Sequence, residues 1–249
     1  MKILLLTVAG MSTRFSKSLG SECLKCIYFE KDMTESLLYR ALRKNESFDK
    51  FIIVGGYKFD ALKSYVDTYL KELKDKIVLL ENPKFKEYGS GYSLYLGIEY
   101  AVNIGFDELI FAEGDLWVDK ESFDNVLLSG RDAVTFNREI ISSDKSVVYY
   151  FDSKKRIHYL YDLAHNSLEI KEPFISIYNS AQIWKFTSLE RVAAAVDDLS
   201  QEEWQSTNLV FIQKYFGELN PNEFDLIEIR KWINCNTVSD FYRIEQEHI

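Results

Sequence analysis

A nearly continuous apolar run at residues 3–9 is the strongest indication of how this chain folds. Such a run is typical of a strand in a parallel sheet with both faces covered. Further strands are predicted at residues 51–54, 77–80, 109–112 and 133–136. Helical spacing fills most gaps, as at residues 61–73 and 90–102. The alternation predicts an α/β fold with a doubly wound, mostly parallel, Rossmann-like sheet, which binds ligands at the carboxyl ends of its strands.

The second half of the chain has a different pattern, which predicts a smaller, β-rich part. Strands are expected at residues 147–151, 156–161 and 174–183, with a hairpin turn at 152–155. Helices are expected at residues 189–199, at 202–215 and after Ser239. No Pro-rich linker or internal repeat separates the halves, so we expect one domain over residues 1–249.

Charge and composition narrow the function classes. Thirty basic and 39 acidic residues give a net charge of −9, which disfavours nucleic acid as a partner. Membrane insertion and a secretory leader are not expected, because no apolar window is long enough, and we predict a cytoplasmic protein. Cys23 and Cys26 form a lone C-x-x-C around Lys25. We interpret them as buried thiols beside an important lysine rather than as a metal or redox site.

The long connection after the first strand carries residues suited to phosphate. Glycine, serine and threonine near Gly10 let backbone N–H groups approach phosphate oxygens, and Arg14 and Lys25 can neutralise the charge. Neither G-x-G-x-x-G nor G-x-x-x-x-G-K-[ST] is present, which disfavours a dinucleotide fold or a P-loop. The pattern predicts a phosphate-binding loop, and a solvated surface loop is the alternative.

This loop resembles the signature of nucleotidyltransferases that make nucleoside-diphosphate sugars and alcohols, usually A-G-x-G-[ST]-R with a later P-K. The matching residues are Ala9-Gly10-Met11-Ser12-Thr13-Arg14-Phe15 and Leu24-Lys25. Ser12 stands where the family usually has its second glycine, and Leu24 where it has proline. The resemblance implies catalytic roles for Arg14 and Lys25. It also implies nucleotide contacts from Ala9, Gly10, Met11, Ser12 and Thr13.

A second stretch, residues 82–94, is similar to the base-contacting loop and helix start of the same enzymes and of molybdenum-cofactor guanylyltransferases. The similarity implies nucleotide contacts from Asn82, Gly91 and Ser93. Ser90 or Ser93 can also cap the helix that follows.

Two segments, one with an acidic side chain and one with an amide side chain, resemble the metal-binding motifs of the family. Asp115 ends the segment Phe111-Ala112-Glu113-Gly114-Asp115 and would hold Mg²⁺. Asn236 would be the second ligand, where aspartate is common, and one charge less predicts weaker metal binding. We expect Asp119 and Asp240 to cap helices instead.

The resemblance implies transfer of a nucleotidyl group to a phosphorylated acceptor, with release of pyrophosphate. The sequence looks most similar to bacterial phosphocholine cytidylyltransferases, which act in cell-surface polysaccharide biosynthesis, so CTP and phosphocholine are favoured. Residues 1–136 would then be the nucleotide-binding half and 137–249 the acceptor-binding half. Because aromatic faces attract quaternary ammonium groups, the candidate acceptor walls are Tyr92, Trp117, Tyr178 and Trp184.

Other readings stay open. A sugar-1-phosphate nucleotidyltransferase would use the same loop with another acceptor. A metal-dependent glycosyltransferase on the same fold would not need Arg14 and Lys25. A regulatory module would bind nucleotide without turnover, and a guanylyltransferase would act on molybdopterin. The sequence does not predict the base, the acceptor or the oligomeric state.

Overall fold

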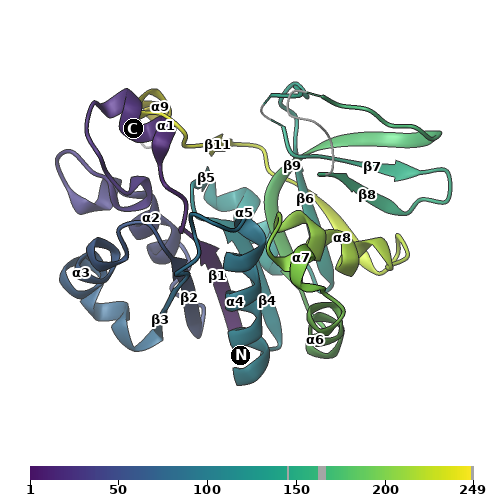
Figure 1. Ribbon diagram of the computed structural model, residues 1–249, viewed down its shortest axis with the longest axis horizontal. Helices are drawn as coiled ribbons and strands as arrows, with labels where there is room; N and C mark the ends of the chain where they lie inside the picture. Colours follow the sequence, from purple (N-terminus) through teal and green to yellow (C-terminus); the bar gives the residue numbers. More distant parts are fainter. Residues whose placement is uncertain (145, 162–166, 248–249) are drawn as a thin grey trace.

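A computed structural model describes residues 1–144, 146–161 and 167–247. Its centre is a twisted sheet with strand order β10-β6-β9-β4-β1-β2-β3 (Figure 1). The parallel part comprises β1 (Lys2–Thr7), β2 (Lys50–Gly55), β3 (Ile77–Glu81) and β4 (Glu108–Glu113). The sheet continues through β9 (Phe174–Phe186), β6 (Asp132–Asn137) and β10 (Phe224–Glu228). β9 runs antiparallel to β4 and β6, and the predicted mostly parallel, doubly wound sheet is confirmed.

Helices cover both faces of this sheet, which explains the apolar run in β1. Ile3 and Leu5 belong to one core, and Leu4 and Leu6 to the other. The first core includes residues of α4 (Ser90–Ile104), α6 (Leu189–Asp197) and α8 (Leu209–Gly217). The second includes residues of α2 (Leu37–Arg43), α3 (Phe59–Tyr69) and α5 (Lys120–Leu128).

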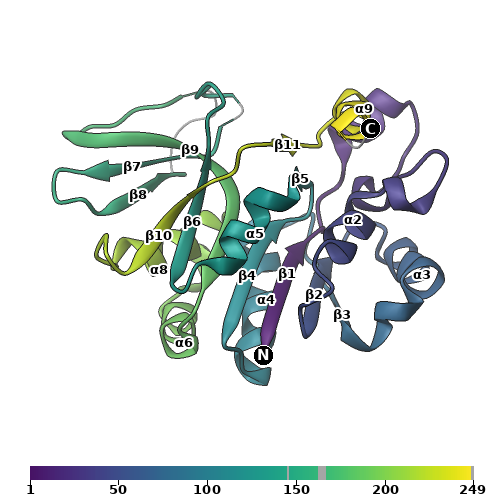
Figure 2. The ribbon, with the colours of Figure 1, turned by 180° about the vertical axis from the view of Figure 1, so that it is seen from behind.

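The smaller β-rich part extends one end of the sheet. β7 (Val148–Asp152) pairs with β8 (Ile157–Leu160) and with the outer half of β9. Asp152 Oδ1 accepts hydrogen bonds from the backbone N–H groups of Lys154 and Arg156, at 2.8 and 2.9 Å, which confirms the predicted hairpin turn. The 13-residue β9 therefore joins the extension to the main sheet (Figure 2).

The last segments of the chain return to the first helix. β11 (Trp232–Asn234) pairs with β5 (Leu116–Val118), and α9 (Val238–Glu247) lies beside α1 (Thr13–Leu19) in both ribbon views. The backbone N–H of Val238 donates to Ser18 Oγ at 3.0 Å. Short 3₁₀ turns, η1 (Lys25–Ile27), η2 (Met33–Glu35) and η3 (Lys71–Lys76), complete the connections.

The helix predicted at residues 202–215 is in fact two, α7 (Gln201–Trp204) and α8. The carbonyl groups between them face the start of α4: Gln205 O accepts from Gly89 N at 2.7 Å, and Ser206 O accepts from Gly91 N at 3.1 Å. A Cβ on Gly89 would lie 1.9 Å from Ser206 O, so this approach requires glycine. The predicted serine cap of α4 is wrong, because Gly89 is the N-cap residue.

The longest helix in the described ranges, α4, has 15 residues, and none of their helices is long and apolar enough to cross a membrane.

Candidate active site

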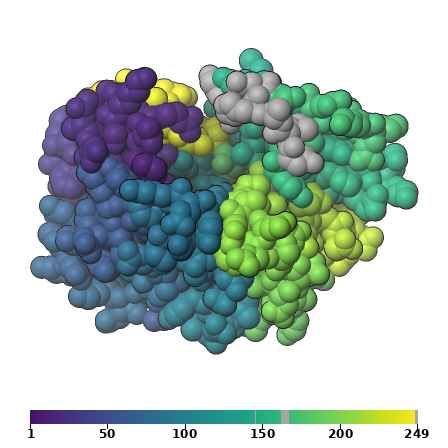
Figure 3. All heavy atoms as spheres, viewed as in Figure 1, coloured from purple at the N-terminus to yellow at the C-terminus, as the bar shows by residue number. Residues whose placement is uncertain are grey.

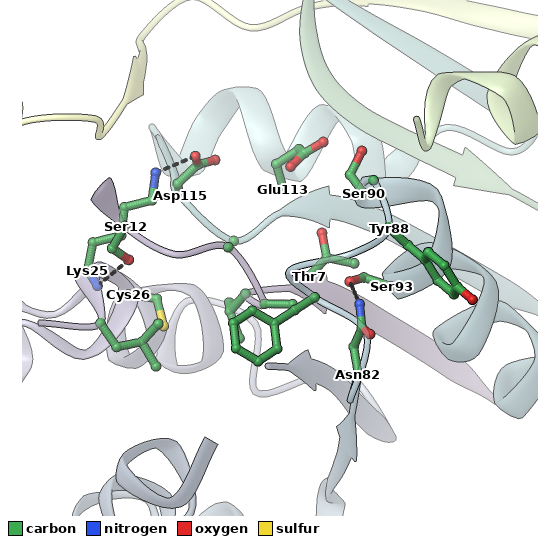
Figure 4. Close-up of a pocket in the computed structure, with 17 residues that line it drawn as sticks. Thr7, Ser12, Lys25, Cys26, Asn82, Tyr88, Ser90, Ser93, Glu113 and Asp115 are labelled. Carbon is green, nitrogen blue, oxygen red and sulfur yellow. Dashed lines mark hydrogen bonds and ion pairs between the residues drawn. The ribbon is translucent and has the colours of Figure 1, made fainter. Parts of the chain in front are cut away.

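The molecular surface is hollowed between the purple N-terminal segment and the green second half of the chain (Figure 3). A cavity of about 220 Å³ opens at the carboxyl ends of β1 and β4, and its lining residues lie between Thr7 and Asp115 (Figure 4). Thr7 and Glu113, the last residues of the two strands, are register partners and line the cavity. Gly114 N donates to Thr7 O at 3.0 Å, and a Cβ on Gly114 would lie 2.2 Å from Val8 Cγ1. This close approach of backbones directs the segment after β4, which carries Asp115, to the cavity.

Four predicted site residues meet at one end of the cavity. Lys25 Nζ lies 2.6 Å from Asp115 Oδ2 and 3.3 Å from Asn236 Oδ1. Arg14 Nη2 donates to the same Asn236 oxygen at 2.8 Å. Only 18% of the Lys25 side chain and 22% of that of Asp115 are exposed, so solvent screens their attraction incompletely. Two cationic side chains, Arg14 and Lys25, therefore lie in contact with two side-chain oxygens from distant parts of the sequence.

Ser12 shows how the loop accommodates its departure from the usual glycine. Its φ is 54°, a left-handed conformation that favours glycine. Its hydroxyl accepts a hydrogen bond from the backbone N–H of Lys25 at 3.1 Å (Figure 4). Leu24, at the proline position, is extended and buried. The serine thus fixes the segment that carries Lys25.

The two thiols near Lys25 differ in burial. Cys26 is buried, which raises the pKa of its thiol to about 12. Cys23 is half-buried, and burial raises its pKa as well. Both cysteines are therefore protonated thiols at neutral pH.

Hydrogen bonds to the segment after β4 and to the start of α9 hold Asn236 in position. Cys235 N donates to Asp115 O at 2.8 Å, and Asn236 N donates to Asp240 Oδ2 at 3.0 Å. The same Asp240 oxygen accepts from Thr237 N at 2.8 Å, which confirms that Asp240 caps the helix start. Asp119 is likewise the N-cap of α5, as predicted.

The oxygens at this end fit a divalent cation such as Mg²⁺. Asp115 Oδ1 is buried and has no hydrogen-bond partner among the described residues, and its Oδ2 lies with Asn236 Oδ1 around one ammonium group. Carboxylate and amide oxygens are hard ligands. Within residues 1–144, 146–161 and 167–247, no group of three or more His, Cys, Asp or Glu side chains could hold a metal, so phosphate oxygens and water would complete the coordination.

The opposite end of the cavity holds Asn82 and Ser93, which are both buried. Asn82 Nδ2 lies 2.9 Å from Ser93 Oγ, and Asn82 Oδ1 accepts from Lys84 N at 2.8 Å (Figure 4). Tyr88 lines the same end, although the sequence did not single it out.

The remaining predicted loop and helix residues differ in position. Ala9, Gly10 and Ser12 line the cavity. Met11 and Thr13 are exposed and lie outside the lining. Gly91 is buried behind it, where a Cβ would lie 2.8 Å from Trp204 O.

Glu113 is a cavity residue to which sequence reasoning gave no role. Asn208 Nδ2 donates to its Oε1 at 2.5 Å, and Asn208 N donates to Ser90 Oγ at 3.1 Å. Burial, with the nearby charge of Asp115, raises the pKa of Glu113 to about 7. Its position at the end of a predicted strand could have marked Glu113 as a site residue. Its contact with Asn208 could not be predicted, because the two residues are 95 positions apart in the sequence.

The four aromatic residues predicted to surround an acceptor do not line the cavity. Trp184 is fully buried against Phe111, with ring centroids 5.1 Å apart, so the prediction for it is wrong. Trp117 is buried on β5, where Lys44 Nζ lies 4.8 Å from its ring centroid. Tyr178 packs on Tyr149 in the extension, and Tyr92 packs on Trp204 outside the cavity wall.

A second cavity, of about 860 Å³, begins at the same charged cluster. Asp115, Arg14 and Asn236 line it at one side. It continues to Asn179 and Gln182 on β9, and to Trp232 on β11. The cluster therefore stands between two cavities, as a site that joins two substrates requires.

Solved structures with the same fold include nucleotidyltransferases. The inositol-1-phosphate CTP transferase from T. maritima is 16% identical over 99% of this chain and 96% of its own, with a TM-score of 0.68. CTP:phosphocholine cytidylyltransferase (LicC) from Streptococcus pneumoniae is 17% identical over 100% and 99%, with a TM-score of 0.64. HddC from Yersinia pseudotuberculosis, complexed with GMP-PN, is 16% identical over 100% of both chains, with a TM-score of 0.63. The fold of this chain is that of the nucleotidyltransferase class.

A family model described as a domain of unknown function (DUF6564) matches residues 21–248, and the chain belongs to that family. A comparison with curated proteins gives no match.

Proposed function

We propose that this protein is a magnesium-dependent nucleotidyltransferase, with CTP favoured as donor and a small phosphorylated alcohol, such as phosphocholine, as acceptor. The observation that carries the proposal is the meeting of Arg14 and Lys25 with the Asp115 and Asn236 oxygens between two cavities. An enzyme that only consumes a nucleotide sugar has no triphosphate to neutralise, and so has less need of both cations.

In the proposed reaction, a phosphate oxygen of the acceptor attacks the α-phosphorus of the triphosphate. A new P–O bond forms, and the bond from the α-phosphorus to the oxygen bridging to the β-phosphate breaks. The electron pair leaves with pyrophosphate. The nucleophile is already an anion, so no general base is needed, and catalysis consists of positioning and charge stabilisation.

Each charged residue would have a separate part in this step. Lys25, a compact cation whose backbone N–H donates to the Ser12 hydroxyl, would stabilise charge at the α-phosphate. Arg14 would hold the departing β- and γ-phosphates with its planar guanidinium. Asp115 and Asn236 would hold Mg²⁺, which when bound supplies positive charge to phosphate oxygens.

The nucleotide preference rests on the other end of the cavity and on the known enzymes. The linked Asn82 and Ser93 side chains would contact the base, and two of the solved structures with this fold are named as acting with CTP. A CDP-choline product would point to cell-surface polysaccharide biosynthesis. A sugar 1-phosphate is the alternative acceptor.

Pyrophosphate release tests the proposal. The four nucleoside triphosphates are each combined with phosphocholine, phosphoethanolamine and several sugar phosphates, with Mg²⁺ present. We expect release that depends on both substrates and is lost in Lys25→Ala. Nucleotide binding without release for any pair would indicate a regulatory module, and turnover of a nucleotide sugar alone would indicate a glycosyltransferase.

A further inference from the structure

We propose that Asn179 and Gln182 select an acceptor whose organic part carries hydroxyl groups, so that a polyol or sugar phosphate is preferred to phosphocholine. This inference rests on the proposed function and narrows its acceptor. It assigns a specificity-determining role to two side chains of the second cavity.

The cavity connects these two residues with the charged cluster. Its lining runs from Arg14 and Asp115 to Asn179 and Gln182, and its volume of about 860 Å³ is within the range of small-molecule sites. An acceptor with its phosphate near Asp115 and Asn236, next to the α-phosphate, would therefore extend its organic part toward β9.

Both residues are largely buried, but their amide atoms keep some accessible surface. Asn179 is 5% exposed and Gln182 is 7% exposed, yet neither side chain has a hydrogen-bond partner in the part of the chain that the structure describes. Asn137, on the neighbouring strand β6, is a useful contrast at 5% exposure. Its Nδ2 donates to Ser180 O at 3.3 Å, and its Oδ1 accepts from Glu139 N at 3.0 Å. The Asn137 amide is thus satisfied within the sheet, whereas the amide atoms of Asn179 and Gln182 on the cavity are open to a ligand or to water.

The backbone at Gln182 forms an irregularity in β9, where the register with β6 shifts. Its φ is 59°, within a strand, where glycine would fit without strain. The position lies between the part of β9 that pairs with β7 and the part that pairs with β4. Gln182 N donates to Ser180 Oγ at 3.1 Å, which holds this bend. This bend carries the Gln182 amide, which has no partner among the described residues, to the cavity, and bulges are common beside binding sites.

These groups match hydroxyls better than a quaternary ammonium. A hydroxyl both donates and accepts, so it can pair with either amide, whereas a trimethylammonium group would displace water and leave both amides unpaired. Trp232 is the one aromatic side chain of the described residues that lines this cavity, and recognition of quaternary ammonium commonly uses a cage of several rings. Loss of one or two such hydrogen bonds corresponds to about a ten- to hundredfold difference in affinity.

The test measures acceptor binding by calorimetry, with a non-hydrolysable CTP analogue and Mg²⁺ present. The probes are glycerol 3-phosphate, inositol 1-phosphate, glucose 1-phosphate, phosphoethanolamine and phosphocholine. Gln182→Gly removes one amide and suits the backbone conformation, and Asn179→Ala removes the other. Gln201→Ala, an exposed residue at the start of α7, is the matched control.

We expect at least one hydroxylated phosphate to bind tenfold or more tightly than phosphocholine to the wild-type protein. Gln182→Gly or Asn179→Ala should remove most of that preference, with phosphocholine binding unchanged and Gln201→Ala behaving as wild type. The inference would be overturned if phosphocholine bound as tightly as every hydroxylated probe, or if no probe bound. It would also be overturned if the substitutions weakened the binding of all probes equally. Pyrophosphate release is measured in parallel. Selective binding without release would contradict the proposed function alone, and release with phosphocholine as the best acceptor would contradict the inference alone.

Discussion

Lys25 Nζ lies 2.6 Å from Asp115 Oδ2, although the two residues are 90 positions apart in the sequence. The ammonium group stands between the Asp115 carboxylate and the Asn236 amide oxygen. In the proposed enzyme, the metal ion would compete with this lysine for the same oxygens, and the triphosphate would compete with those oxygens for the lysine. The contact therefore links the loop after β1 to the metal site before substrate binds.

Replacing Asp115 with alanine should abolish magnesium-dependent turnover, with a loss of 1,000-fold or more, because the metal would lose its only charged protein ligand in the proposed pair. Circular dichroism should show an intact fold. The control is Asp60→Ala, whose side chain is 100% exposed on α3. Turnover near the wild-type rate in Asp115→Ala would reject the metal assignment.

Lys25→Ala should lower kcat about 100-fold or more while the KM for CTP changes little, because the charge of Lys25 would act mainly in the transition state. Steady-state pyrophosphate release gives both constants. Lys17→Ala removes an exposed lysine of α1 and should behave as wild type. Equal effects of the two substitutions would show that only general positive charge matters.

Asn236→Asp should raise the apparent affinity for Mg²⁺ several-fold, because it adds one negative charge to the ligand set. The measurement is the magnesium concentration that gives half-maximal turnover. A fall in affinity would indicate that Arg14, which already donates to Asn236 Oδ1 at 2.8 Å, then binds the new carboxylate too tightly. That result would argue against Asn236 as a ligand.

Glu113→Gln should make the effect of pH on stability smaller. The raised pKa of Glu113, about 7, means that the folded protein loses stability from this group as pH rises from about 4.5 to 7. Glutamine keeps an oxygen for Asn208 and does not ionise. We expect the variant to exceed wild type by about 1 kcal/mol at pH 8 and to match it near pH 4.5, as measured by urea unfolding. A difference that is the same at both pH values would contradict the assignment.

Gly89→Ala should destabilise the fold by about 1–3 kcal/mol, because its Cβ would lie 1.9 Å from Ser206 O and push the start of α4 from the α7–α8 connection. Gly130→Ala is the matched control, since a Cβ there meets no atom within 4 Å. Thermal unfolding of both variants separates a packing effect from a general effect of alanine. Similar melting temperatures would show that this contact is not rigid.

Much of the fold was predictable because β1 to β4 keep apolar residues on both faces. Because β1 and β4 are parallel neighbours, their last residues, Thr7 and Glu113, lie side by side at the carboxyl end of the sheet. The sequence motifs that follow the two strands therefore start close together. The sequence also predicted the meeting of Lys25 with Asp115, although only through resemblance to a known family. The spacing of residues along the sequence does not by itself predict that two residues 90 positions apart are in contact.

The acceptor side was less predictable, because composition does not tell a core aromatic residue from one on a cavity. Trp184 lies on β9 where the strand is covered on both faces, so the indole packs on Phe111. Two residues earlier, the backbone of Gln182 turns to a left-handed conformation and the cavity begins. No apolar or polar pattern in the sequence marks that change of conformation.

The return of the chain from β11 to α9, beside α1, has a consequence for synthesis of the protein. Asn236 reaches the charged cluster only through this late segment, whereas Arg14 and Lys25 emerge from the ribosome early. If the chain is the proposed enzyme, the central strands could pair while translation continues, but the nascent chain would stay inactive until almost all of it has been made. Partial products of translation would therefore carry a nucleotide loop without the ability to turn over substrate.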